Sequence, residues 1–160
     1  MKKTIILALV CASILSFGCA SLRQTPEEKA RIAEQVQENL DNRTFAIDIT
    51  QVNPQKGSPK HVTNYSVRVN GDILDSNLPY FGSAWSLPYG GGKGLHFEAP
   101  ITDYIETFPK PDRRQILLST DNGEDVLVYS ITVFTDGSAT VIVRSRNRDQ
   151  ISYYGNIVTE

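Results

Sequence analysis

Residues 78–94 read LPYFGSAWSLPYGGGKG and hold the densest group of side chains suited to ligand binding in this chain. Four of its 14 aromatic residues fall within ten positions: Tyr80, Phe81, Trp85 and Tyr89. Aromatic rings on a glycine-flanked loop suit sugars, apolar ligands or a partner protein. Lys93, among glycine N–H groups, could hold an anion as a backbone nest does. This stretch is the first candidate ligand site.

The same stretch can also be explained as a way of turning the chain twice. Leu-Pro-Tyr occurs at residues 78–80 and 87–89, and each proline fixes φ and lacks an N–H. The glycines at 90–94 permit positive φ. Residues 83–87 between the corners would extend for about 17 Å, at ~3.3 Å per residue. We favour this structural role and keep ligand binding as the alternative.

Three alternating arginines, Arg144, Arg146 and Arg148, form a second candidate site. On a continuing strand their guanidinium groups would point to one side and could bind a lipid headgroup, an acidic polysaccharide or a peptide carboxylate. Charged residues also keep an edge strand from pairing with another molecule, and we favour that explanation of the three.

Motifs for catalysis or metal binding are not evident. Lys93 is followed by Gly94, where a Walker loop needs Ser or Thr, and residues 95–99 have the pattern of a strand instead of a helix. His61 and His96 are isolated, so we expect no metal or other cofactor. There is no Gly-x-Ser-x-Gly elbow, and the spacing of the 18 acidic residues singles out no glycosidase pair. We expect a protein that is not an enzyme.

The N-terminus predicts a lipid anchor. Two lysines precede an apolar run at residues 4–15, which is shorter than the roughly 20 residues that span a bilayer. Residues 15–21, Leu-Ser-Phe-Gly-Cys-Ala-Ser, resemble a bacterial lipobox, although Phe17 is bulkier than the usual residue there. We expect residues 1–18 to leave as a lipoprotein signal peptide. Cys19 would then carry the lipid, including palmitate, and residues 19–24 would be the tether.

The lipid on Cys19 would be the membrane contact of the mature protein. Ala20, where an Asp would retain the lipoprotein at the inner membrane, favours the outer membrane facing the periplasm, with display at the cell surface as an alternative. Without residues 1–18, 14 basic residues face 18 acidic ones, so nucleic acid is not an expected partner. The remaining cysteine, Cys11, leaves with the signal peptide, so residues 25–160 must fold as one domain without disulfides.

A helix is expected first in this domain. Thr25, Pro26 and Glu28 match a capping box with proline at the first helical position, and the helix should end near Asn42. Its apolar residues form one narrow stripe, so one face packs and the rest is solvated. They are Ile32, Ala33, Val36 and Leu40.

From Thr44 onward the pattern has period two, with hairpin signals at Asn-Gly 70–71, Asn-Gly 122–123 and Asp-Gly 136–137. If the last two are two-residue loops, Leu118 faces Leu127 and Ile131 faces Ile142. One apolar surface then contains Ile116, Leu118, Leu127, Tyr129, Ile131, Val133 and Ile142. The reverse face contains Leu117, Val126, Val128, Phe134, Ala139, Val141 and Val143.

Both faces are therefore partly buried, which a flat solvated meander would not show. We predict an α+β fold that is mostly β. An N-terminal amphipathic helix should pack on a strongly curved antiparallel meander sheet, closed as a sandwich or a partial barrel.

Several motifs together resemble one family. Leu-Pro-Tyr-Phe-Gly at 78–82, Tyr-Gly-Gly-Gly at 89–92, Phe97, and Ile-Ser-Tyr-Tyr-Gly at 151–155 resemble the signature of domain of unknown function 4251. That family contains secreted or lipid-anchored proteins of gut-type Gram-negative anaerobes. The resemblance spans residues 44–158 and implies a shared fold and an envelope location. It implies no activity and no site residues.

We therefore expect a non-catalytic binding or accessory module of the cell envelope, with a small ligand, a glycan or an envelope protein as its partner. One alternative is a hydrolase directed at glycan or the envelope, which needs two carboxylates in a cleft. The other is a structural scaffold lipoprotein in an outer-membrane complex, which needs a flat exposed apolar patch.

Overall fold

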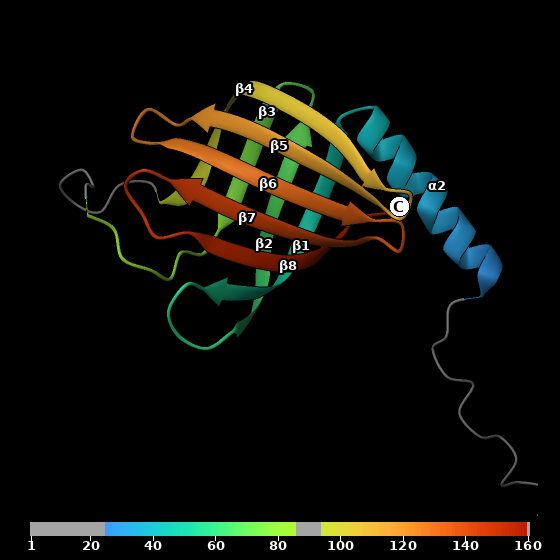
Figure 1. Ribbon diagram of the computed structural model, residues 1–160, viewed down its shortest axis with the longest axis horizontal. Helices are drawn as coiled ribbons and strands as arrows, with labels where there is room; N and C mark the ends of the chain where they lie inside the picture. The colour runs from blue at the N-terminus through green and yellow to red at the C-terminus, as the bar shows by residue number, and fades with distance from the viewer. Residues whose placement is uncertain (1–24, 86–93, 160) are drawn as a thin grey trace, which may run out of the picture.

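Eight antiparallel strands form a closed barrel, and a single described helix lies beside one end of it (Figure 1). The computed structural model describes residues 25–85 and 94–159. Each strand pairs with the next along the chain, and the last pairs with the first. The elements are α2 (Pro26–Asp41), β1 (Thr44–Pro54), β2 (Lys60–Asn70), β3 (Ile73–Leu78), β4 (Leu95–Lys110), β5 (Arg113–Asp121), β6 (Val126–Phe134), β7 (Ser138–Ser145) and β8 (Ile151–Ile157).

The mostly-β class, the antiparallel meander and the N-terminal helix are confirmed. The sheet is more closed than the expected sandwich or partial barrel, because β1 pairs with β2 on one side and with β8 on the other. Both pairings shift register between Ile49 and Gln51, and such a bulge bends a strand. Gly155 of β8 lies opposite Ile49, where a Cβ would stand 2.0 Å from the carbonyl oxygen of Asp48. Glycine is therefore what the closing contact requires.

The turn between β6 and β7 differs from the prediction. Ile131 pairs with Val141 instead of Ile142, because the loop has three residues instead of two. The Gly137 amide donates to the Phe134 carbonyl at 3.0 Å, and Gly137 has φ of 86°. This is the three-residue hairpin loop whose last residue is left-handed. A one-residue change exchanges the faces of a strand, so the inward residues of β7 are Ala139, Val141 and Val143.

The turn between β5 and β6 is also longer than predicted, with a different consequence. Leu118 pairs with Tyr129 instead of Leu127, and residues 122–125 form the loop. The Asn122 side chain closes it by accepting from the amides of Glu124 and Asp125, both at 2.9 Å. A shift of two residues keeps every side chain on its face. The predicted inward residues other than Ile142 are therefore buried: Ile116, Leu118, Leu127, Tyr129, Ile131 and Val133.

The barrel interior is packed with apolar side chains and a few paired polar ones. The Tyr129 hydroxyl lies 2.9 Å from the Ser76 hydroxyl, which also lies 3.0 Å from the carbonyl of Leu95. The Tyr153 hydroxyl donates to the Pro79 carbonyl at 2.8 Å. Burial raises the pKa of both phenols. Buried phenols in this interior therefore stay neutral well above the pH at which exposed ones ionise.

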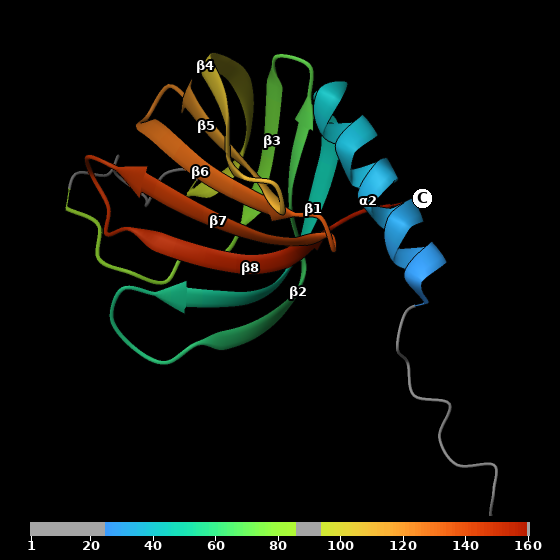
Figure 2. The same cartoon turned by 45° about the vertical axis from the view of Figure 1, so that its right-hand side comes forward.

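The helix begins as predicted, with the Thr25 side chain accepting from the amide of Glu28 at 3.2 Å. Val36 and Leu40 are its buried residues and anchor it to the barrel. Seen from two directions, the helix stands beside the end of the barrel where it leads into β1 (Figures 1 and 2). The turns β2–β3, β4–β5 and β6–β7 lie at this helix end, and the connections β1–β2, β5–β6 and β7–β8 lie at the opposite, loop end. Within the described residues, no helix has the length and apolarity to span a bilayer.

We predict that Gly155→Ala lowers the free energy of unfolding by about 1–3 kcal/mol, because the new methyl group must push β8 away from β1. The measurement is urea unfolding followed by circular dichroism. Asn156→Ala is the matched control, since Asn156 is the next residue of β8 and is exposed. Equal stability of the two variants would show that the β1–β8 contact is less tight than the structure indicates.

A second prediction concerns alkaline pH. Burial, and next the charge of Glu106, raise the pKa of Tyr104 from its usual 10.0 to about 12. The folded state thus holds this proton longer than the unfolded chain does. Its stabilising contribution is complete below about pH 10 and is lost as the pH rises toward 12.

Unfolding in urea at pH values around 9 to 11 tests this prediction. The Tyr104 hydroxyl is buried without a hydrogen-bond partner among the described residues, so Tyr104→Phe should cost little near neutral pH. The same variant should lose less stability than the parent protein as the pH rises. Parallel curves for the two proteins would refute the raised pKa.

Candidate functional site

Residues 83–85 of the predicted aromatic stretch are hydrogen-bonded to the β7–β8 connection. The Trp85 amide donates to the Asn147 carbonyl at 3.1 Å, and the Asp149 amide donates to the Ser83 carbonyl at 3.0 Å. Ala84 forms an isolated antiparallel bridge with Arg148. Residues 83–85 are therefore extended across the loop end of the barrel. Of the predicted ligand residues, Tyr89 and Lys93 lie outside the described residues.

The three described aromatic rings are not brought together into one site. The Tyr80 hydroxyl lies 2.8 Å from the Ser83 carbonyl and 3.2 Å from the Asp149 carbonyl, which holds the segment in place. The Trp85 indole donates to the Arg146 carbonyl at 3.1 Å, yet its residue is 63% exposed. Phe81 is exposed, with the Lys60 ammonium 5.3 Å from its ring centre. Tyr80 thus has a structural role, and two rings remain open to solvent.

The three alternating arginines do not form the expected patch. β7 ends at Ser145, so the alternation does not continue through residue 148. Arg144 and Arg146 are exposed, and Arg144 donates to the Gln150 side chain at 2.7 Å. Arg148 is buried. The prediction that all three point to one side is wrong, because the chain leaves the strand before Arg148.

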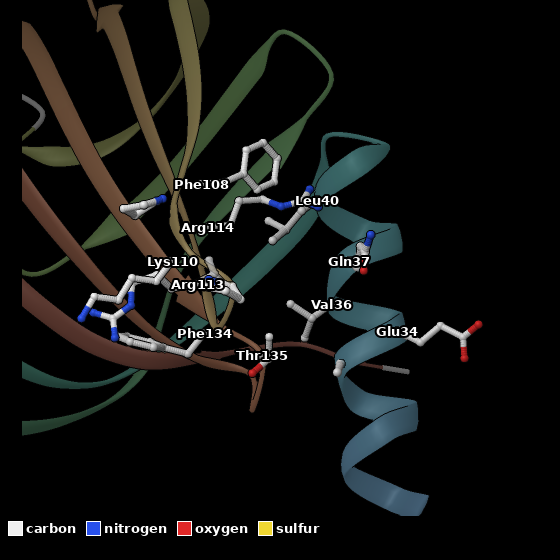
Figure 3. A pocket seen from close by; sticks show the side chains of 14 residues that line it. Glu34, Val36, Gln37, Leu40, Phe108, Lys110, Arg113, Arg114, Phe134 and Thr135 are labelled. Atoms are coloured by element: carbon white, nitrogen blue, oxygen red, sulfur yellow. The ribbon is translucent and has the colours of Figure 1, made fainter.

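A groove at the helix end is a further candidate site (Figure 3), and its volume is about 670 Å³. Ligand pockets commonly measure roughly 300–1,000 Å³. The helix provides one wall, and the β4–β5 hairpin and the end of β6 provide the other. The lining residues are Ala33, Glu34, Val36, Gln37, Leu40, Phe108, Pro109, Lys110, Pro111, Arg113, Arg114, Val133, Phe134 and Thr135.

The groove exists because the apolar stripe of the helix is narrow. Only Val36 and Leu40 are fully buried, so the helix touches the barrel along a line and leaves a hollow beside it. On the barrel side, the half-buried ring of Phe134 provides apolar surface. Phe108, near the end of β4, is 68% exposed at the rim. Such a surface removes the apolar part of a ligand from water.

Two of the three cations in the groove are neutralised by neighbours. Arg113 binds Asp112 through two parallel hydrogen bonds, from Nε at 3.0 Å and from Nη2 at 2.9 Å. These bonds lower the pKa of Asp112, so its carboxylate stays charged. Arg114 forms ion pairs with Asp41 at 2.6 Å and with Glu106 at 3.0 Å. Both guanidinium groups are thereby held in fixed positions.

Lys110 is the remaining cation of the groove. No ion pair of 4.0 Å or less joins it to a carboxylate in the described part of the chain. Its charge contributes to the lowered pKa of Asp112, but it forms no direct ion pair, so its ammonium group is available to an acidic ligand, whereas Arg113 and Arg114 are engaged. Among the described residues that line the groove, Glu34 on the helix is the one acidic side chain.

Metal binding has no structural support within residues 25–85 and 94–159. No three His, Cys, Asp or Glu side chains in these ranges gather in a way that could hold an ion.

The groove was missed by sequence reasoning. Phe108-Pro109-Lys110-Pro111-Asp112-Arg113-Arg114 combines an aromatic ring, two prolines and three cations in seven residues. That composition was a usable signal. What the sequence did not reveal is that the barrel places this hairpin opposite the helical stripe of residues 32–40.

Comparison with known proteins supports the fold and a family. A crystal structure of a DUF4251 family protein from Bacteroides eggerthii resembles the chain with a TM-score of 0.63 and 18% identity, covering 81% of this chain and 89% of the other. At that identity the likeness concerns the fold alone. No curated protein matches the chain. The family model "Domain of unknown function (DUF4251)" matches residues 27–157, and the chain therefore belongs to the DUF4251 family.

Proposed function

We propose that this protein is a lipid-anchored, non-catalytic binding module of the cell envelope. Its ligand is a small, mostly apolar molecule with one acidic group, bound in the groove between α2 and the barrel. The observation that carries the proposal is a groove with apolar residues on both walls and one cation, Lys110, that no described carboxylate pairs.

The two kinds of groove residue have separate roles in binding. Ala33, Phe108 and Phe134, which are half-buried or exposed, offer apolar surface, and its burial supplies affinity at about 25 cal/mol per Å². The Lys110 ammonium adds a charge contact at the rim, which contributes little affinity in water but selects acidic ligands over neutral ones. The ligand is therefore an amphiphile such as a fatty-acid-like carboxylate.

The ion pairs around the groove support a non-catalytic role over a hydrolase. A glycosidase needs two carboxylates that converge on one bond. Asp41 and Glu106 are both engaged by Arg114, and Asp112 is engaged by Arg113. Glu34 is left as a single acidic group on the groove wall. The arrangement suits holding a ligand better than cleaving one.

The position of the groove fits an anchor at Cys19. The helix cap Thr25 follows Cys19 by six positions, so the tether reaches at most about 20 Å. The helix then leads directly to the groove, which it lines from Ala33 to Leu40. An anchored domain therefore keeps the groove near the membrane, in our proposal the outer membrane facing the periplasm, where amphiphiles gather.

Binding is tested with sodium decanoate and the neutral 1-decanol in an NMR titration of the chain from Ala20 onward, which contains every described residue. Decanoate should shift the amides of Val36, Leu40 and Lys110. Lys110→Gln should weaken decanoate binding about two- to five-fold and leave decanol unchanged, because only the charge contact is lost. Lys60→Gln is the matched control, since Lys60 is exposed on β2 and lines no part of the groove. Shifts confined to other regions, or equal effects of the two lysine variants, would refute the groove as the site.

The anchor is tested separately. Cys19→Ser should abolish labelling by radioactive palmitate and move the protein from the membrane fraction to the soluble periplasmic fraction, because the thiol that carries the lipid is gone. Cys11→Ser should change neither result, since Cys11 lies in the predicted signal peptide. Continued labelling of the Cys19 variant would overturn the proposed anchor and leave the groove proposal untouched.

A further inference from the structure

A buried arginine lies at the loop end of the barrel, opposite the groove. The side chain of Arg148 is 4% exposed, and that of its neighbour Asp125 is 3% exposed. The Tyr80 ring covers the guanidinium, with 5.6 Å between the guanidinium carbon and the ring centre. A buried arginine requires partners for its N–H groups as well as for its charge.

One edge of this guanidinium forms no hydrogen bond within the described structure. Arg148 Nε and Nη2 are both buried and form no hydrogen bond within the described structure. These two nitrogens carry parallel N–H groups, the edge that binds a carboxylate through two hydrogen bonds. Arg113 uses the same two nitrogens to bind Asp112 at 3.0 and 2.9 Å. The structure thus contains one such edge that is hydrogen-bonded to a carboxylate, in Arg113, and one that is not, in Arg148.

Asp125 compensates the charge of Arg148 without filling this edge. Its Oδ2 atom is 3.6 Å from Arg148 Nε, too far for a hydrogen bond. Oδ2 instead accepts from the Ser145 hydroxyl, and Oδ1 accepts from the side-chain Nδ2 of Asn147 at 3.2 Å. The carboxylate is therefore held by the β7–β8 connection and does not close on the arginine.

A third donor without a partner lies in the neighbouring turn. Asn122 Nδ2 is buried and has no hydrogen-bond partner among the described residues, while Asn122 Oδ1 binds the amide of Asp125. The hydrogen bonds to Oδ1 fix which way the Asn122 amide points. The unpartnered buried atoms near Asp125 are therefore all donors. A complementary ligand must be an acceptor, and a carboxylate matches the geometry of the open edge.

We propose that the Nε–Nη2 edge of Arg148 is a binding site for the carboxylate of a small acid, beneath residues 80–85. This site goes beyond the proposed groove function, because it lies at the other end of the barrel and uses none of the groove residues. The covering segment is held by backbone hydrogen bonds to Asn147 and Asp149, and its residues 81–85 are exposed. No buried apolar side chain of residues 81–85 has to leave the core when an acid enters.

The single tryptophan of the chain reports on this site. The Trp85 indole donates a hydrogen bond to the Arg146 carbonyl, and its backbone amide donates to the Asn147 carbonyl. A change at residues 146–148 therefore alters the surroundings of the Trp85 ring. The experiment titrates the chain from Ala20 onward with sodium acetate and follows Trp85 fluorescence. Sodium chloride at equal ionic strength is the control for salt. We expect a saturable change with acetate and none with chloride.

Three variants separate the site from general anion effects. Arg148→Lys keeps the charge but loses the parallel N–H pair, and should weaken acetate binding at least tenfold. Arg144→Lys is the matched control on an exposed arginine and should bind like the parent protein. Asp125→Asn removes the competing negative charge and should strengthen acetate binding several-fold. Thermal unfolding by circular dichroism verifies the fold of each variant.

The absence of a saturable, acetate-specific response in the parent protein would overturn the proposal. Equal binding by the folded Arg148→Lys variant would also overturn it. If that variant does not fold, Asp125→Asn decides, because unchanged or weaker acetate binding would show that the edge of Arg148 is not the site.

Discussion

The closing contact between β1 and β8 determines the rest of this structure. It depends on a bulge beside Ile49 and on Gly155, whose missing side chain allows two backbones to meet within a distance that a Cβ could not tolerate. Closure removes both free edges of the sheet. It also places the start of β1, and so the helix that precedes it, beside the β4–β5 and β6–β7 turns. The groove is a consequence of that placement, because its two walls come from segments about 70 to 100 residues apart (Figure 3).

The two ends of the barrel differ in chemistry because different connections meet there. Short turns and the helix meet at one end, where apolar residues and Lys110 form the groove. Longer connections meet at the other end, where Asp125, Ser145 and Asn147 form a polar cluster around Arg148. Three arginines illustrate the difference. Arg113 is paired at the rim, Arg114 lies between two carboxylates, and Arg148 is buried with one edge open.

Local features of the fold were predictable where neighbouring residues decide them. The Thr25 cap, the helical stripe, the strand periods and the existence of the hairpins follow from interactions within a few residues. Register was less predictable. The Asp-Gly pair at 136–137 suits a two-residue loop, but the structure uses a three-residue loop with Gly137 left-handed. The one additional loop residue turns Ile142 outward and Val141 inward. The choice between a two-residue and a three-residue loop depends on how both strands pack in the barrel.

The sequence by itself determined the class of the fold, the start of its helix, most inward positions and the family, because each is encoded in residue types at short spacing. It also pointed to the aromatic stretch at 78–94, whose described part is bound to the β7–β8 connection. Only the tertiary structure decided that the sheet closes, that the helix faces the hairpin carrying Phe108 and Lys110, and that Arg148 is separated from Arg144 and Arg146. These outcomes depend on contacts between residues far apart in the chain, and local pattern carries no information about such distances.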